Sequence, residues 1–488
     1  MTNPLGSVTL RPLRDGPSAP RTAGSVRSLS RPSVRLARLS VHTLRVSARL
    51  LVGMSAALVS LELLAAWLTP HVDAGLHVAL ALVAWELAVQ GLVTQAALAR
   101  RDDRAPVSPF AVSVLVAAWN EEKDIVATVR SILAQEGVGL EVIVADDGST
   151  DRTRQVLSEA FALAAAEDGS LVDPRARVRV VTLPHRGKGA TLEAARGLAR
   201  HPILVTVDAD TVLGPGAIER LTRAFMDPAV EAAAGSVVVR DADDALSRFQ
   251  HLEYLKTTLV RCGWSELGML EQVPGAFAAL RASAVEHAGG FPTDSLTEDY
   301  EVMFRLYARA AEEGRLIRVP TVSEACAYTE PPRTLGGLSR QRTRWFAGFL
   351  VTLARFRALT FHPQADAFGL VRLPIKWVDA VLPLWSLGSL TVVIGVAVAS
   401  PASARLEVSA LGVALVLLRL GVDLVQTFLA LRLHARAPSR LPSREPVAAL
   451  TWMHALLEAF TYTWLRQLLV IRAYAFALAR GRVWEASR

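Results

Sequence analysis

Long apolar segments lie near both ends of this chain and enclose a middle stretch of mixed polarity. Four of them are about as long as the 20 mostly apolar residues that an α-helix needs to cross a bilayer. They are residues 48–69, 76–98, 380–400 and 406–431. The sequence therefore predicts two transmembrane helices within residues 47–100 and two or three within residues 380–480. The uncertain one is residues 447–478, because its ionisable side chains suit either a span with a polar interior or an interfacial helix.

The distribution of arginine predicts how these helices are oriented. Arginines flank the first predicted pair of spans on its outer sides, whereas its connecting loop, residues 70–75, contains no lysine or arginine. A further group of arginines follows residue 431. Because positively charged loops stay in the cytoplasm, we expect the middle stretch to be cytoplasmic, at the inner membrane. The only two cysteines, Cys262 and Cys326, lie in this stretch, as expected for reduced thiols.

The formal net charge of +7 does not indicate a nucleic-acid-binding protein. Much of the excess lies in residues 1–46, which contain eight arginines and one acid, Asp15. A segment so rich in arginine, serine and proline cannot bury a core, so we expect a disordered tail that contacts acidic lipid.

Three carboxylates fall inside the predicted spans, at Glu62, Glu86 and Glu458. A charge inside a bilayer normally faces the interior of a helix bundle or a water-filled path. Two interpretations remain open: structural ion pairs with Arg419 or Arg466, or a polar translocation path.

The middle stretch, residues 107–340, alternates short β-branched runs with helical patterns. The predicted strands are residues 112–119, 141–147, 178–183 and 203–210, and a helix is predicted after each of them. Such alternation indicates an α/β fold with a doubly wound, mostly parallel sheet. Ligands of such sheets bind beyond the carboxyl ends of the strands, where we expect polar motifs.

Acidic residues end two of these strands. Asp146 and Asp147 end the second, and Asp208 and Asp210 end the fourth. Carboxylates gathered at neighbouring strand ends repel one another unless a cation compensates. Mg²⁺ or Mn²⁺ would do so, since both prefer oxygen ligands and leave positions for substrate phosphates. We therefore expect a divalent-metal site here.

Further along the chain, three more segments carry candidate functional residues. Lys188 begins a helix in a glycine-rich segment that lacks the spacing of a phosphate-binding P-loop, so it either meets a diphosphate or an acidic edge, or is a solvated lysine. Glu298 and Asp299 precede a helical pattern. Gln341, Arg344 and Trp345 open an amphipathic stretch, and residues 341–379 are predicted to be interfacial helices.

Taken together, these motifs resemble those of the membrane-bound polysaccharide synthases among the inverting family-2 glycosyltransferases, which make cellulose, chitin, hyaluronan or poly-N-acetylglucosamine. The resemblance covers residues 107–350 and the flanking helices. Four motifs occur in the order of that family, centred on Asp146 and Asp147, Asp208 and Asp210, Asp299, and Gln341, Arg344 and Trp345.

The resemblance implies a GT-A type fold and a metal-dependent transfer of sugar from a nucleotide-sugar, such as a UDP-sugar. On the donor side, Asp146 and Asp147 would hold the base, and Asp208 and Asp210 the metal and the diphosphate. Gln341 and Arg344 would hold the leaving group. Residues 185–189 depart from the family's usual version, which leaves the expected contact of Lys188 with the donor open.

On the acceptor side, the resemblance implies that Asp299 is the general base and that Trp345 stacks on the acceptor sugar. We also expect Glu298 and Phe277 near the acceptor. The acceptor is either a growing polysaccharide, whose transfer can be coupled to export and can need a small membrane subunit, or a lipid-linked molecule glycosylated once. A third alternative is a transporter or scaffold with a degenerate domain, which the presence of Asp208, Asp210 and Asp299 disfavours.

Overall fold

A computed structural model describes residues 46–50, 53, 59, 61, 74–100, 108–384, 402–438 and 448–486. Residues 1–45 of the predicted tail, most of the first predicted span and residues 385–400 of the third lie outside these residues. Within the described ranges, no helix is both long enough and apolar enough to cross a membrane.

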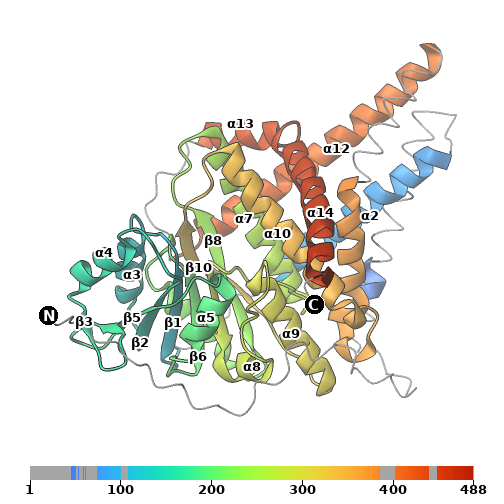
Figure 1. Cartoon of the computed structure of the whole chain (residues 1–488). Coiled ribbons are helices and arrows are strands. Elements are labelled where there is room, and N and C mark those ends of the chain that lie inside the picture. The colour runs from blue at the N-terminus through green and yellow to red at the C-terminus, as the bar shows by residue number, and fades with distance from the viewer. Residues whose placement is uncertain are drawn as a thin grey trace.

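The sheet at the centre of the chain begins as predicted (Figure 1). Four strands run parallel in the order β5-β2-β1-β6. They are β1 (Val112–Ala118), β2 (Leu140–Asp146), β5 (Val178–Thr182) and β6 (Ile203–Asp208). The helices that follow them are α3 (Ile125–Leu133), α4 (Thr153–Phe161), α5 (Lys188–Arg196) and α6 (Ala217–Arg223). The predicted strand–helix alternation is therefore confirmed.

The prediction of a mostly parallel sheet is wrong for the rest of it, because the remaining strands make the sheet mixed. Strand β9 (Phe277–Arg281) lies antiparallel between β6 and β8 (Ala232–Val239). Beyond β8, β10 (Thr321–Thr329) is parallel, and the short β7 (Val212–Leu213) pairs antiparallel with β10. Strands β3 (Ala164–Ala165) and β4 (Leu171–Val172) form an antiparallel edge beside β5. Strand β9 follows a long helix, residues 245–266, and the turn at Pro274, and it pairs antiparallel with both of its neighbours.

Helices cover both faces of the sheet, as a doubly wound fold requires. On one face, Val112, Val114 and Val116 of β1 pack with side chains of α3, α4 and α6. On the other face, Leu115 packs in a second core with side chains of α5, α7 (Ala245–Glu266) and α9 (Glu298–Glu312). Residues of β1 thus alternate between two cores, as the period of a strand dictates.

A group of long helices stands beside the sheet (Figure 1). It comprises α2 (Ala74–Ala99), α10 (Leu335–Arg355), α12 (Ala402–Ala435), α13 (Ala448–Glu458) and α14 (Tyr462–Ala486). Helix α10 packs along α14, and both α2 and α12 pack against α7. The segment predicted from residue 447 therefore forms two helices, which separate at residues 459–461.

Ion pairs join these helices to one another and to α7. Glu86 of α2 pairs with Arg419 of α12, which confirms one of the two partners considered for it. Glu458 pairs with Lys256 of α7 at 2.8 Å, and not with Arg466. That pairing was not predicted, because the contact of α13 with α7 is invisible in the sequence. Glu62 lies outside the described residues.

Phe277 is buried in the sheet and faces Gly235 of the neighbouring strand β8. A methyl group added at Gly235 would come within 2.2 Å of Phe277 Cδ1, which is far closer than van der Waals contact. The absence of a side chain at residue 235 is thus what lets the ring lie against β8.

Gly235→Ala should lower the free energy of unfolding by about 1–3 kcal/mol, because the added methyl overpacks a full core. Thermal or denaturant unfolding followed by tryptophan fluorescence measures this. Gly91→Ala in α2 is the control, since its methyl would meet no atom within 4 Å. Equal stability of the two variants would contradict this account of the Phe277 contact.

Candidate active site

Lys188, at the first turn of α5, connects two acidic residues beyond the carboxyl end of the sheet. Its Nζ lies 2.6 Å from Asp208 Oδ1 at the end of β6 and 2.9 Å from Glu298 Oε1 at the start of α9. Burial lowers the pKa of the ammonium group, but the charges of Asp208 and Glu298 outweigh burial and raise it above its ordinary value. The predicted solvated lysine is therefore wrong, and Lys188 is a fixed cation of the site.

The loop before Lys188 is held by Asp147. Its two carboxylate oxygens accept hydrogen bonds from the backbone N–H groups of Arg186 and Gly187, at 2.8 and 2.9 Å. Gly187 has φ +91°, a conformation that side chains disfavour. Asp146 in turn accepts a hydrogen bond from the backbone of Ser149. Both acids therefore order the loops that lead into the site.

The four predicted acids do not meet at neighbouring strand ends, because β1 lies between β2 and β6. Asp210 is accompanied instead by Asp208 and by Glu121, which follows β1. Burial and then the charge of Asp208 raise the pKa of Asp210 to about 6. Burial and then the charge of Asp210 raise that of Glu121 to about 7. These shifts indicate a concentration of negative charge that a cation would relieve.

Asp210 itself is fixed by two hydroxyl groups. The hydroxyls of Thr211 and Thr329 both donate to its Oδ1 at 3.1 Å. Asp208 and Asp210 offer the hard oxygen ligands that Mg²⁺ and Mn²⁺ prefer. In the described ranges, however, no three or more histidine, cysteine or acidic side chains are grouped so that they could hold a metal ion. Two carboxylates leave further positions of such a cation for water or for phosphate oxygens of a substrate.

Asp299 lies beside this group, at the start of α9. Its Oδ2 accepts hydrogen bonds from Gln272 Nε2 at 3.0 Å and from the backbone N–H of Gly275 at 3.2 Å, and its Oδ1 from the backbone N–H of Tyr300. Burial and the adjacent charge of Glu298 raise the pKa of Asp299, which Lys188 and Gln272 oppose. A carboxylate so placed can accept a proton.

Helix α10 brings the last motif to the same region. Gly348 packs on Thr297, where a methyl group would come within 2.4 Å of the threonine hydroxyl oxygen. Arg344 is exposed and donates to the carbonyl of Leu296 at 3.4 Å. Trp345 is half-buried, with its ring 6.5 Å from that of Tyr254. The α10 motif therefore flanks the loop that carries Asp299.

Comparison with known proteins agrees with this arrangement. Residues 109–348 match the model of the family described as "Glycosyltransferase like family 2". These residues form a family-2 glycosyltransferase domain. Its mixed α/β fold with one large sheet is of the GT-A type, as predicted from the resemblance.

Relatives of known function also match the glycosyltransferase domain. The poly-β-1,6-N-acetyl-D-glucosamine synthase of Staphylococcus aureus is 28% identical over 241 residues, which are 49% of this chain and 54% of the synthase. The synthase of Staphylococcus epidermidis matches to the same extent. The chain thus spans about half the length of the curated relatives that it matches.

Two solved structures were also found to be similar. One is the mannosyltransferase PcManGT from Pyrobaculum calidifontis in complex with GDP-Man and Mn²⁺. It has a TM-score of 0.49 and 22% identity, and the match covers 80% of this chain and 96% of that one. The other is S. aureus TarS, with a TM-score of 0.34 and 17% identity, covering 50% of this chain and 39% of that one.

The position of Phe277 does not support its predicted contact with an acceptor. The ring is fully buried in the sheet of the glycosyltransferase domain, so it has no free face for a sugar. The adjacent glycine-containing turn is what approaches the site, since a methyl group on Gly275 would come within 3.1 Å of Lys188 Nζ. Glu298 is buried as well, and its partner is Lys188.

The motifs left several residues of the glycosyltransferase domain without a role. Trp119, at the end of β1, is 52% exposed, and its ring is stacked on His185 at 4.9 Å. Arg342, between Gln341 and Arg344, is fully buried, bonds Gln341 Oε1 at 2.8 Å and lies 4.3 Å above the ring of Trp345. An aromatic residue at the end of a predicted strand could have indicated a ligand-binding role for Trp119. Nothing in the sequence indicated that Arg342 is buried.

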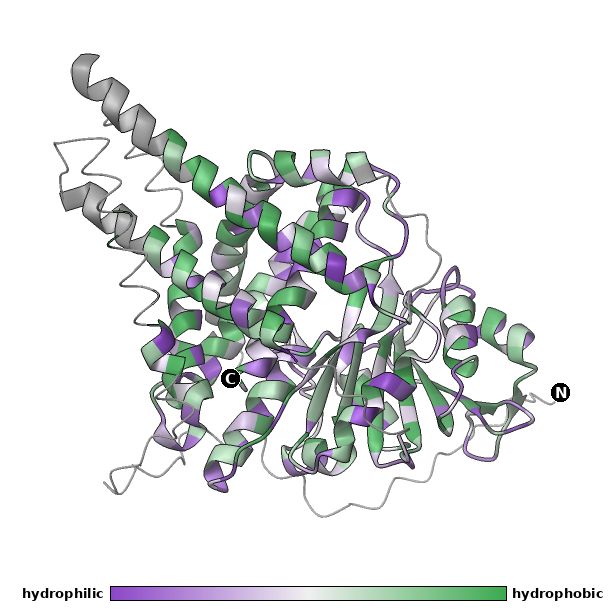
Figure 2. Cartoon of the chain, turned by 180° about the vertical axis from the view of Figure 1, so that it is seen from behind, coloured by the Kyte–Doolittle hydropathy of each residue, from purple (hydrophilic) through white to green (hydrophobic). Residues whose placement is uncertain are grey.

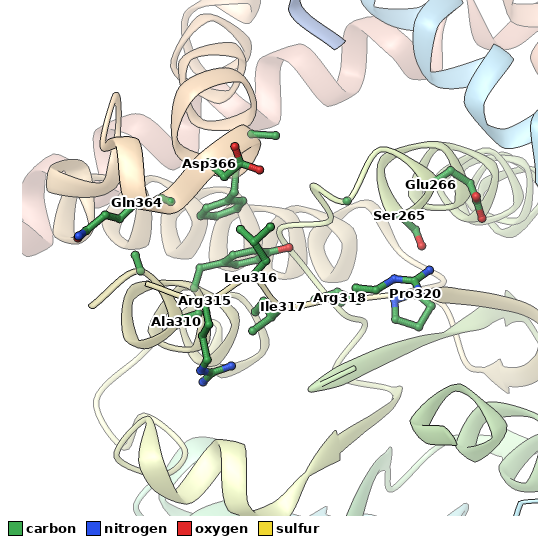
Figure 3. A pocket seen from close by; sticks show the side chains of 17 residues that line it. Ser265, Glu266, Ala310, Arg315, Leu316, Ile317, Arg318, Pro320, Gln364 and Asp366 are labelled. Atoms are coloured by element: carbon green, nitrogen blue, oxygen red, sulfur yellow. The ribbon is translucent and has the colours of Figure 1, made fainter. Parts of the chain in front are cut away.

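A cavity of about 330 Å³ lies away from these residues (Figure 3). It is formed by the end of α7 at Ser265 and Glu266, the segment from Arg315 to Pro320, and the turn at Gln364 and Asp366. None of the predicted site residues lines it. The candidate site therefore lies outside this cavity, and Glu298 and Asp299 line a second, smaller one.

Proposed function

We propose that this domain transfers a sugar from a nucleoside diphosphate sugar to a hydroxyl group of a carbohydrate or glycolipid acceptor, with inversion. The observation that carries the proposal is the position of Asp299 next to the Lys188–Glu298 pair, which reaches Asp208. The proposed base thus stands beside a lysine and beside an acid that could hold a metal ion together with the diphosphate. In the reaction, the acceptor oxygen bonds the anomeric carbon, the bond to the diphosphate oxygen breaks, and Asp299 takes the hydroxyl proton.

On the donor side, each expected contact has a residue suited to it. Asp208 and Asp210 would hold Mg²⁺ or Mn²⁺ together with phosphate oxygens, and a bound cation would neutralise charge on the leaving diphosphate. The stacked pair of Trp119 and His185 presents an aromatic surface near Asp147 for the nucleotide base. Gln341 and Arg344 are proposed to hold the leaving group, as the family resemblance implies.

On the acceptor side, we propose that Trp345 covers one face of the acceptor sugar. The apolar face of a sugar ring suits an indole, and this one is held in place by Arg342 and Tyr254. The similarity to poly-N-acetylglucosamine synthases supports a polymer product, and the family resemblance of the motifs implies a UDP-sugar as the donor. A single transfer to a lipid-linked acceptor uses the same residues and is the alternative.

We propose further that the chain is an integral protein of the cytoplasmic membrane. Besides the four apolar segments of the sequence, the helices beside the sheet contain many hydrophobic residues (Figure 2). The side chains of several of these residues are exposed. Examples are Val413, Leu417 and Val425 of α12, Leu456 of α13 and Leu468 of α14. Apolar surface of this extent supports contact with lipid or with a partner. The arginine-rich flanks support a cytoplasmic domain.

Labelling of introduced cysteines in intact cells tests this orientation. Asp73→Cys should react with an impermeant maleimide, whereas Arg154→Cys, on the exposed side of α4, should react only after the cells are opened. The background should be low because Cys262 and Cys326 are buried. The reverse pattern of labelling would contradict the proposed topology.

Binding of Mn²⁺ should weaken in acid, because the carboxyl group of Asp210 is ionised above its pKa of about 6 and protonated below it. Below this pH, the apparent affinity should fall by about tenfold per pH unit, as one proton competes with the metal. Mn²⁺ titrations with a UDP-sugar, whose diphosphate stays ionised, measure this between pH 5 and pH 8. Asp210→Asn should lose most of the affinity and the pH dependence, and Asp243→Asn, an exposed acid, should lose neither. An affinity for Mn²⁺ that does not depend on pH would contradict the assignment of Asp210 as a metal ligand.

The function itself is tested by assaying the protein in lipid with UDP-, GDP- and TDP-sugars and Mn²⁺ or Mg²⁺, and then sizing the product. A polymer supports the synthase, and a single added sugar supports the alternative. With the active donor, Asp299→Asn should lower kcat by about 10² to 10⁴-fold, because no group then accepts the proton.

Two further variants serve as controls for the effect of Asp299→Asn on kcat. Asp294→Asn, an exposed acid on the same loop, should keep normal turnover. If Glu298→Gln abolishes turnover while Asp299→Asn keeps it, the base has been assigned to the wrong carboxylate.

A further inference from the structure

The side chain of Gln272 contacts the proposed base Asp299 from a segment that none of the family motifs includes. Residues 268–276 connect α7 to β9 and pass alongside the start of α9. Gln272 Nε2 donates to Asp299 Oδ2 at 3.0 Å, and it is the only side chain with a hydrogen bond to this carboxylate in the described part of the chain. The other two donors to Asp299 are backbone N–H groups.

The orientation of the Gln272 amide is dictated by the chemistry of its two partners. Arg261 of α7 donates from Nη2 to Gln272 Oε1 at 2.9 Å. A guanidinium group can only donate hydrogen bonds, and an ionised carboxylate can only accept them. The amide oxygen must therefore face Arg261, and the NH₂ group must face Asp299. Arg261 thus keeps a donor directed at the base.

The residue before Gln272 is also held by charged partners. Glu271 is buried and forms two hydrogen bonds with Arg372, from Nε at 2.8 Å and from Nη2 at 2.5 Å. Lys376 adds a third contact with Glu271 at 3.0 Å. Glu271 is thus held by Arg372 and Lys376, and Gln272 by Arg261. These contacts leave the Gln272 amide little freedom.

We propose that Gln272 is a positioning residue for catalysis: with Arg261 behind it, it holds Asp299 in the ionised form and in the orientation that accepts the acceptor proton. The proposal rests on the proposed function, since it requires that Asp299 be the base. Gln272 itself does not exchange a proton and need not touch either substrate.

Several charged or titratable groups face Asp299, and Gln272 differs from all of them because its side chain does not titrate. Glu298 of α9 disfavours the ionised form, whereas Lys188 of α5 favours it. Arg261 of α7 and Tyr300 of α9 also interact with the charge of Asp299. A hydrogen bond from a neutral donor stabilises the ionised carboxylate, so its loss must raise the pKa of Asp299 further. The Gln272 side chain also adds no charge that would perturb the proposed diphosphate site.

The test is the pH dependence of kcat in Gln272→Met, which keeps the length of the side chain and removes both ends of the amide. The acid limb of the profile should move to higher pH by about one unit, and most of kcat should return in alkali. KM for the donor sugar should change little. An acid limb in its wild-type position would overturn the proposal, even if kcat were lower at every pH.

Gln272→Glu provides a second variant of the same shape. The new carboxylate would pair with Arg261 but would lie against Asp299, so the acid limb should move further than in Gln272→Met. A shift smaller than that of Gln272→Met would count against the proposal. Gln135→Met is the matched control: it removes a buried amide that bonds the carbonyls of Ser131 and Gly214, and it should leave the acid limb unchanged.

Failure of this inference can be distinguished from failure of the proposed function by including Asp299→Asn. If Asp299→Asn abolishes turnover and the acid limb of Gln272→Met stays in place, Asp299 is the base but Gln272 does not position it. If Asp299→Asn keeps its turnover, the proposed function fails, and the positioning role fails with it.

Discussion

The negative charge gathered beyond the carboxyl end of the sheet is the constraint on which the site depends. Asp208, Asp210, Glu298 and Asp299 could not all stay ionised in so small a space without a positive charge among them. Lys188 supplies it, and in doing so ties the end of β6 to the starts of α5 and α9. The turn at Gly275 passes close to this contact, since a methyl group there would lie 3.1 Å from Lys188 Nζ. One ammonium group thus sets the positions of three elements of the domain.

Helix α7 carries this arrangement beyond the sheet. Some residues of α7 contact the candidate site, and others contact the C-terminal helices. Tyr254 lies between the charged cluster and Trp345, and Arg261 holds Gln272. Lys256 pairs with Glu458 of α13, and Glu253 bonds both Arg342 and the hydroxyl of Tyr462 on α14. The C-terminal helices are therefore linked to the acceptor side of the site through α7 as well as through the direct packing of α10 on α14.

The sequence could predict what depends on local pattern. The strands around Val114, Val142, Val180 and Val205 are buried β-branched runs, and the acids that follow two of them mark the functional edge. It could not predict what depends on pairing between distant segments. The antiparallel entry of β9, the burial of Phe277 against Gly235, and the partners of Lys188 and Gln272 all join residues far apart in the chain. Arginine usually lies at the protein surface, so nothing in the sequence indicated that Arg342 is buried. Its burial depends on contacts with Glu253 and with α14.

The buried guanidinium of Arg342 has a consequence for where this protein can be divided. The family match ends at residue 348, and a fragment cut there would retain every recognised motif. It would nevertheless lose Tyr462 and Arg466, which share the charge of Glu253 with Arg342. A carboxylate and a guanidinium that are enclosed by protein in the whole chain would then lie on a newly opened surface beside Trp345. We therefore expect a fragment that ends at the limit of the family match to be less stable than a chain that continues through α14.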